Sequence, residues 1–156
     1  MLSKLRDEIK QTRPFAGAEQ EAFLNLQRTA DVLLRGLELV LKPSGLTQSQ
    51  YNVLRILRGA GSGGLLCREI SDRMITRDPD MTRLLDRLEV RSLVTRSRDR
   101  QDRRSITVRI TQAGKELLAG LDEPVSDLHK QQLSHLGGER LRALIKLLEG
   151  AREQLG

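Results

Sequence analysis

The sequence predicts a mainly α-helical protein, formally α+β, with six or so helices and one small antiparallel β-wing. Two patterns indicate this class. Leucine-rich stripes recur at three- and four-residue steps along most of the chain, which is typical of amphipathic helices. Residues 94–98 and 106–110 instead alternate apolar and polar side chains on either side of an arginine-rich tip, as the strands of a half-buried hairpin do.

Length and composition limit the possible domain architecture and the cellular compartment. The 156 residues suffice for one domain, or for one domain with helical extensions. With two Phe, one Tyr and no Trp, the core should be aliphatic. No apolar run approaches the ~18 residues of a membrane span, and the N-terminus has no signal-peptide core. The single cysteine, Cys67, cannot form an internal disulfide, which agrees with a reducing compartment. We therefore expect a cytoplasmic protein without a membrane partner.

Positive charge is concentrated in one stretch. The chain carries a net charge of +6, and residues 91–111 hold seven arginines against two aspartates, a net of +5. A strongly basic surface predicts a polyanionic partner, of which nucleic acid is the commonest, although membranes also attract basic surfaces. The six-residue hairpin tip, DRQDRR, is longer and more cationic than a hairpin requires. We therefore expect something outside the fold to bind it.

Two helices are expected in the first part of the chain. Residues 1–14 are polar and predict an extension or a short helix, and residues 17–42 predict a long amphipathic helix. Thr47 can cap the backbone N–H of Gln50 while the Gln50 side chain reaches back, which is a capping box at the start of the next helix. That helix should stop in the glycine-rich link at residues 59–64.

The middle of the chain predicts a compact motif. Residues 65–66 are expected to form a short strand that pairs with the hairpin, and residues 67–75 a helix of one to two turns. Asp78 before Pro79 indicates an N-cap followed by proline at the first helical position, so a further helix should run to residue 91. Short helix, turn, helix and basic hairpin is the order of a winged helix-turn-helix.

Two more helices are expected after the hairpin. Thr111 caps the first, and Pro124 should kink or interrupt it. A break at residues 135–138 precedes the last helix. The winged domain offers little surface for the apolar stripes of these helices and of the first long helix, so their simplest destination is a second copy of the chain. We expect an N-terminal dimerisation region, a winged DNA-binding domain and C-terminal dimerisation helices at residues 1–43, 44–111 and 112–156.

The combination of helix and basic hairpin resembles the MarR family of bacterial winged-helix regulators. Across roughly residues 20–155, the matching positions are Gly45, Leu46, Thr47, Gln50, Tyr51, Leu54, residues 82–89, Asp99, Asp102, Arg103, Arg104, Val108, Ile110, Thr111 and Gly114. The resemblance implies an obligate homodimer, joined by its N- and C-terminal helices, that binds a pseudo-palindromic operator in double-stranded DNA. Family members often repress transcription, and many release DNA when a small anionic or phenolic effector, or an oxidant, alters the dimer.

Two residues depart from the family pattern. Most relatives carry glycine where this chain has Ser92, and a non-glycine residue in a left-handed helix cap costs about 1 kcal/mol, which the fold should tolerate. Relatives commonly have proline after the first wing aspartate, where this chain has Arg100. The substitution predicts a looser tip with one more positive charge.

The helix before the hairpin is the expected recognition helix. Its candidate DNA contacts are Arg77, Asp80, Thr82, Arg83 and Arg87. Arg83 can reach guanine O6 and N7, and Thr82 can contact a phosphate or a thymine methyl. Asp80 can accept a hydrogen bond from cytosine N4 and so help to exclude other bases. The alternative is that these residues form only a solvated helix face.

The hairpin is the expected wing. Its candidate DNA contacts are Arg96, Arg98, Arg100, Asp102, Arg103 and Arg104. The resemblance implies that Asp102 orients Arg104 through a short salt bridge and that one tip arginine enters the minor groove, where narrow A·T-rich DNA has enhanced negative potential. Arg100, Arg103 and Arg104 are all candidates for that arginine. The alternative is generic attraction of the wing to phosphate.

Other chemistry finds little support in the sequence. Cys67 opens a helix, a position that can activate a thiol, so redox sensing stands beside the alternative of a small, partly buried filler. The spacing of His129 and His135 matches no tight metal template, and we expect no metal and no cofactor. Neither a G-x-S-x-G motif nor a phosphate-binding loop occurs, so we expect no enzyme. A winged-helix protein-interaction module that docks on an acidic partner protein is the alternative function.

Overall fold

A computed structural model describes residues 3–99 and 101–156, and the chain divides into two compact units, Met1–Gly36 and Leu37–Gly156. In the first unit, α1 (Lys4–Glu8) is a single short helix that buries Leu5. The long helix α2 (Ala18–Leu41) begins in this unit and ends in the second. Both helices confirm the sequence-based expectation for this part of the chain.

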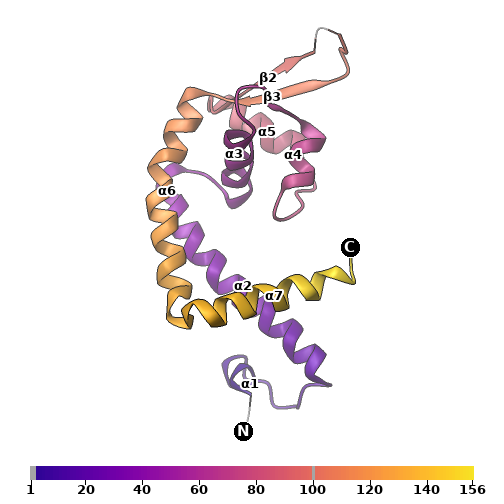
Figure 1. Ribbon diagram of the computed structural model, residues 1–156, viewed down its shortest axis with the longest axis vertical. Helices are drawn as coiled ribbons and strands as arrows, with labels where there is room; N and C mark the ends of the chain where they lie inside the picture. The colour runs from indigo at the N-terminus through magenta and orange to yellow at the C-terminus, as the bar shows by residue number, and fades with distance from the viewer. Residues whose placement is uncertain (1–2, 100) are drawn as a thin grey trace. The chain divides into compact units, whose positions relative to one another are not determined.

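The second unit has the element order of a winged helix-turn-helix followed by two helices (Figure 1). After the end of α2, its elements are η1 (Lys42–Ser44), α3 (Gln48–Ala60), β1 (Leu65–Leu66), α4 (Cys67–Arg73), α5 (Met81–Val90), β2 (Val94–Arg98), β3 (Ile106–Ile110), α6 (Gln112–Leu133), η2 (Ser134–Leu136) and α7 (Gly137–Glu153). This mainly helical fold with a small antiparallel sheet confirms the predicted fold class.

The three strands form one antiparallel sheet in the order β1-β3-β2. In the hairpin, Val94 pairs with Ile110 and Arg98 with Ile106, so β2 and β3 match along their whole length. Leu65 of β1 pairs with Val108 of β3, which confirms the predicted pairing of this short strand with the hairpin. The central strand β3 therefore connects the helical part of the module to the wing.

A single aliphatic core holds α3, α4, α5 and the sheet together. Side chains with essentially no exposed surface come from every one of these elements and from α6; they include Leu54, Leu57, Ile70, Leu88, Val94, Val108 and Leu118. The capping box at the start of α3 is present in both directions. Thr47 Oγ1 accepts from the Gln50 N–H at 3.1 Å, and Gln50 Oε1 accepts from the Thr47 N–H at 3.0 Å.

Some helix ends differ from expectation. Helix α4 stops at Arg73, two residues early, because Met74 adopts extended backbone as the chain turns toward α5. Helix α6 runs without interruption through Pro124, so the predicted interruption is absent, while the alternative, a kink, stays a prediction. Proline removes one backbone donor and crowds the carbonyl one turn before it, but buried Leu121 and Val125 keep the turns on both sides of it packed against the core. None of the helices in the described ranges combines the length and apolarity needed to cross a membrane.

The connection between α5 and β2 is a three-residue turn with a left-handed residue, Ser92, at φ 58°. The Ser92 N–H donates to Glu89 O at 2.8 Å and the Leu93 N–H to Leu88 O at 3.0 Å, which is the hydrogen-bond pattern of a Schellman cap. Thr111 then binds this turn: its N–H donates to Leu93 O at 3.0 Å and its hydroxyl to Ser92 O at 2.7 Å. As predicted, the fold tolerates serine here.

The start of α6 packs against the same turn. Thr111 Oγ1 accepts from the Gly114 N–H at 3.0 Å and so caps the helix, as its sequence predicts. A Cβ atom at Gly114 would lie 2.5 Å from the Leu93 carbonyl oxygen, well inside van der Waals contact. Glycine is therefore required where α6 approaches the turn between the recognition helix and the wing.

We predict that Gly114→Ala destabilises the protein, because its added methyl group meets backbone rather than a movable side chain. The expected loss in the free energy of unfolding is about 1–3 kcal/mol, measured by urea denaturation. Gly120→Ala is the matched control, since it lies in the same helix with no atom within 4 Å of the new Cβ. The control should gain about 0.5–1 kcal/mol from helix propensity. Equal effects of the two substitutions would show that Gly114 is not sterically required.

Candidate nucleic-acid interface

The recognition helix α5 begins later than its sequence predicts, and its cap is Asp80 rather than Asp78. Asp80 Oδ1 accepts from the Arg83 N–H at 3.0 Å. Asp78 Oδ1 instead accepts from the Asp80 N–H at 2.9 Å, so that Pro79 lies in the preceding turn. Both aspartates can cap a helix, and the local turn formed by Asp78 moves the start of α5 two residues onward.

Helix α5 has one buried and one exposed face, as the apolar stripe in its sequence predicts. Met81, Leu84, Leu85 and Leu88 are buried in the core. Thr82, Arg83, Asp86 and Arg87 are exposed on the other side, and Arg77 is exposed in the turn before the helix. A rigid helix with polar side chains on its open face is the form in which DNA-binding modules present their reading groups to the major groove.

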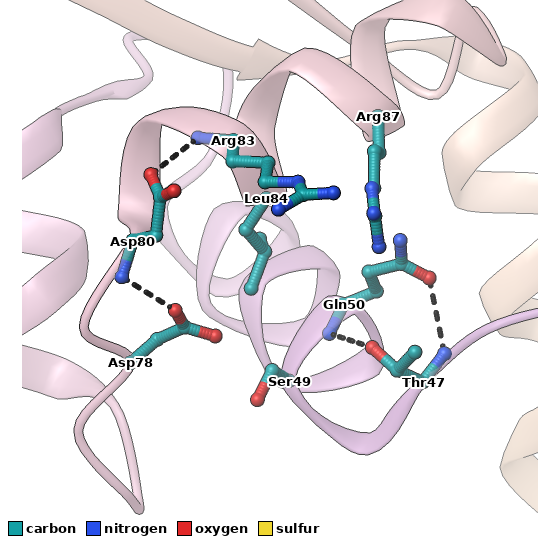
Figure 2. A pocket seen from close by; sticks show the side chains of 8 residues that line it. All are labelled: Thr47, Ser49, Gln50, Asp78, Asp80, Arg83, Leu84 and Arg87. Atoms are coloured by element: carbon teal, nitrogen blue, oxygen red, sulfur yellow. Dashed lines mark hydrogen bonds between the residues drawn. The ribbon is translucent and has the colours of Figure 1, made fainter.

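A polar cleft separates the first turn of α3 from α5 (Figure 2). Its lining residues are Thr47, Ser49, Gln50, Asp78, Asp80, Arg83, Leu84 and Arg87. Three predicted recognition residues, Asp80, Arg83 and Arg87, thus meet at one cleft. The sequence identified Gln50 only as a capping residue, because a capping box does not show what the rest of the side chain faces.

The wing tip departs from the implied salt bridge between Asp102 and Arg104. Asp102 Oδ1 accepts from the backbone N–H of Arg104 at 3.0 Å, and its Oδ2 accepts from the Ser105 hydroxyl at 2.9 Å. These two hydrogen bonds hold the pKa of Asp102 below its usual range. Asp102 therefore shapes the tip through the turn, while the guanidinium of Arg104 forms no ion pair within the described part of the chain. Arg100 lies outside the described residues.

Arg96, a predicted DNA contact of the wing, is bound within the fold instead of being free to contact DNA. Its guanidinium donates to Asp86 at 2.5 Å and to Glu89 at 3.0 Å, which ties β2 to α5. The side chain is 23% exposed, the least of the three partners. The hydrogen bonds that Arg96 donates to Glu89 and Asp86 raise the pKa of Arg96, and the same contact with Arg96 lowers the pKa of Glu89. The sequence showed the charge of Arg96 but not its two acidic partners on the preceding helix.

The arginines of the basic stretch fall into two groups. Arg91 donates to Ser44 O at 2.7 Å and Arg109 to the Ser97 hydroxyl at 2.9 Å, so these two, like Arg96, bind other parts of the fold. Within residues 3–99 and 101–156, six guanidinium groups of the predicted site form no hydrogen bond or ion pair: those of Arg77, Arg83, Arg87, Arg98, Arg103 and Arg104. The structure thus leaves a set of cations on α5, its preceding turn and the wing available to an external anion.

Cys67 is half-buried at the first residue of α4. It borders a groove with Arg68 and with the wing residues Asp102 and Arg104. Redox sensing by Cys67 stays a prediction. No cluster of His, Cys, Asp and Glu in the described part of the chain has the arrangement of a metal site.

Comparisons with known proteins agree on one family. The MarR family model matches residues 46–106. An uncharacterized HTH-type transcriptional regulator of Bacillus subtilis, YfiV, is 32% identical over 116 residues, which cover 70% of this chain and 71% of the relative. The crystal structure of a MarR transcription factor from Planctomyces limnophilus is 42% identical with a TM-score of 0.68, over 87% of this chain and 98% of that one.

A more distant structure adds a DNA complex. A mutant of Escherichia coli MarR, complexed with operator DNA, is 24% identical to this chain with a TM-score of 0.74. The match covers 96% of this chain and 99% of that one. At this level of identity the likeness concerns the fold alone.

We predict that the contact between Glu89 and Arg96 makes stability depend on pH. Because Arg96 lowers the folded-state pKa of Glu89, ionised Glu89 stabilises the fold above its unfolded value of about 4.3. That contribution is lost as the pH falls through the folded-state pKa. Glu89→Gln should therefore lower the free energy of unfolding at neutral pH and have a smaller effect at a pH below about 4.3. Urea denaturation at both pH values measures the difference.

The matched control is Glu116→Gln, which neutralises an exposed carboxylate on α6 whose single partner among the described residues is Gln112, at 3.4 Å. Its effect at neutral pH should be smaller than that of Glu89→Gln. If both variants lost the same stability at neutral pH, the contact of Glu89 with Arg96 would not contribute to the fold.

Proposed function

We propose that this chain, which belongs to the MarR family of DNA-binding transcriptional regulators, binds a pseudo-palindromic operator in double-stranded DNA as a homodimer and represses transcription. Members of this family are transcriptional regulators and not enzymes. The observation that carries the proposal is the set of unpaired arginines on α5 and the wing. Both elements belong to one compact unit and are joined by the ion pairs of Arg96, so a single approach to DNA would bring both into contact with it.

The proposed DNA contacts fall into two groups, those that recognise base edges and those that bind the backbone or the minor groove. Arg83 and Thr82 on the open face of α5 are assigned to base edges in the major groove, where a guanidinium can bind guanine O6 and N7. Arg98, Arg103 and Arg104 are assigned to phosphates and to the minor groove beside the wing. Arg96 is assigned to hold the wing at a fixed position on α5, because its charge is already matched by Asp86 and Glu89.

Exposed apolar side chains support a homodimer. On α2, Phe23 is 60% and Val32 55% exposed. On α7 no residue is buried, and Ile145 and Leu147 are 52% and 72% exposed. Large apolar surfaces of this kind usually bind another protein surface, and a second copy of the chain would supply one. The two recognition helices would then enter successive major grooves about 34 Å apart.

Repression and its release follow from the same binding. A dimer on an operator that overlaps a promoter blocks transcription by occupying the site. We further propose, on the family resemblance alone, that a small anionic or phenolic effector releases the DNA by stabilising a dimer whose two recognition helices no longer match the operator spacing.

The experiment that tests the function is binding to the inverted repeats upstream of its own coding sequence. Fluorescence anisotropy should show tighter binding to an intact repeat than to a scrambled one, and sedimentation should show two chains per duplex. Equal affinity for both duplexes would instead favour a protein-interaction module that docks on an acidic partner.

We predict that Asp80→Asn loosens specificity more than it weakens binding. Asparagine keeps an oxygen that can accept from the Arg83 N–H, so the cap of α5 is retained. The substitution removes the negative charge that repels phosphate and weakens the acceptor for cytosine N4. Competition between operator variants that differ at one base pair should show reduced discrimination with nearly unchanged operator affinity. Unchanged discrimination would assign Asp80 to capping alone.

A further inference from the structure

Gln50 presents an unpaired donor to the cleft between α3 and α5. The residue is only 7% exposed, and its Oε1 accepts from the Thr47 N–H at 3.0 Å. Because the Thr47 N–H can only donate, the amide oxygen must face it and the NH₂ group must face the opposite way. In Figure 2 that NH₂ group points toward Arg87. Within the described residues it donates to no acceptor, and it faces the open cleft rather than the packed core.

The other groups at this end of the cleft are donors as well. The side chain of Arg87 extends from α5 toward Gln50 (Figure 2) and forms no hydrogen bond or ion pair within the described residues. Ser49 lies in the first turn of the thirteen-residue helix α3, where backbone N–H groups have no partner within the helix. The Gln50 amide and the Arg87 guanidinium, both donors, therefore meet beside the N-terminus of a helix, which is an arrangement that binds oxyanions.

The opposite end of the cleft is acidic. Asp78 and Asp80 lie there, away from Gln50 and Arg87 (Figure 2). One oxygen of each carboxylate accepts a backbone N–H, and the remaining oxygens keep the negative charge. An anion is thus repelled from this end and attracted to the other, so the cleft has one position for it.

We propose that the Gln50 end of this cleft holds one phosphate of the DNA backbone in each half-site. The inference rests on the proposed function and adds a positioning contact to it. The cleft is open to solvent and its α5 side carries Arg83, which is assigned to bases, so a strand that flanks those bases can cross it. A phosphate bound here fixes the depth and register of α5 in the major groove, since backbone contacts position a protein on DNA without reading sequence.

The test substitutes Gln50→Glu. Glutamate is the other residue that completes a capping box, so its carboxylate still accepts from the Thr47 N–H and α3 is retained. The NH₂ donor becomes a carboxylate oxygen that repels phosphate. Operator affinity should fall about tenfold or more, while thermal unfolding stays close to that of the wild type. Gln131→Glu, which makes the same change at an exposed position of α6 outside the cleft, should lose much less.

Neutral methylphosphonates placed singly along the operator identify the contacted phosphate. In the wild type, one position per half-site should weaken binding about tenfold, and in Gln50→Glu the same position should have no further effect. Identical methylphosphonate profiles in both proteins would overturn the proposal. A flat profile together with competition by free inorganic phosphate, in the wild type but not in Gln50→Glu, would assign the cleft to a free oxyanion and also overturn it. Wild-type protein without operator preference would overturn the proposed function itself.

Discussion

The turn between α5 and β2 is the constraint on which the DNA-binding module depends. In three residues the chain changes from the recognition helix to the wing, which requires Ser92 to adopt a left-handed conformation. Thr111 donates to the carbonyl oxygens of Ser92 and Leu93 and also caps α6. Gly114 allows α6 to approach closely. Recognition helix, both wing strands and the first C-terminal helix therefore meet at one hydrogen-bonded site, and their relative positions are fixed together.

This constraint explains how the arginines are used. A wing attached so closely to α5 needs cations that hold it in place as well as cations that bind DNA. Arg96 supplies the first kind through Asp86 and Glu89 on α5, and Arg109 through the Ser62 carbonyl oxygen in the link before β1. We propose the second kind for the arginines of the wing tip and of the open face of α5. The high local charge would then serve both folding and binding, and only the partners of each arginine separate the two uses.

Much of the fold could be predicted because local patterns determine it. The capping box at Thr47, the alternating strands and the Thr111 cap each rest on residues within a few positions of one another. The start of α5 was misassigned because Asp78 and Asp80 are both good caps, and only the turn geometry decides between them. The role of Arg96 and the unpaired amide of Gln50 could not be predicted, because their partners or neighbours lie on other elements and depend on tertiary packing.

The central claim is that unpaired arginines on α5 and the wing bind the DNA backbone and bases as one unit. The most direct measurement is operator affinity as a function of salt concentration. If the dimer neutralises about six phosphates, affinity should fall roughly 10³-fold between about 50 and 200 mM salt, because bound cations release condensed counterions. An affinity that hardly changes over this range would contradict the claim and would place the DNA contacts elsewhere.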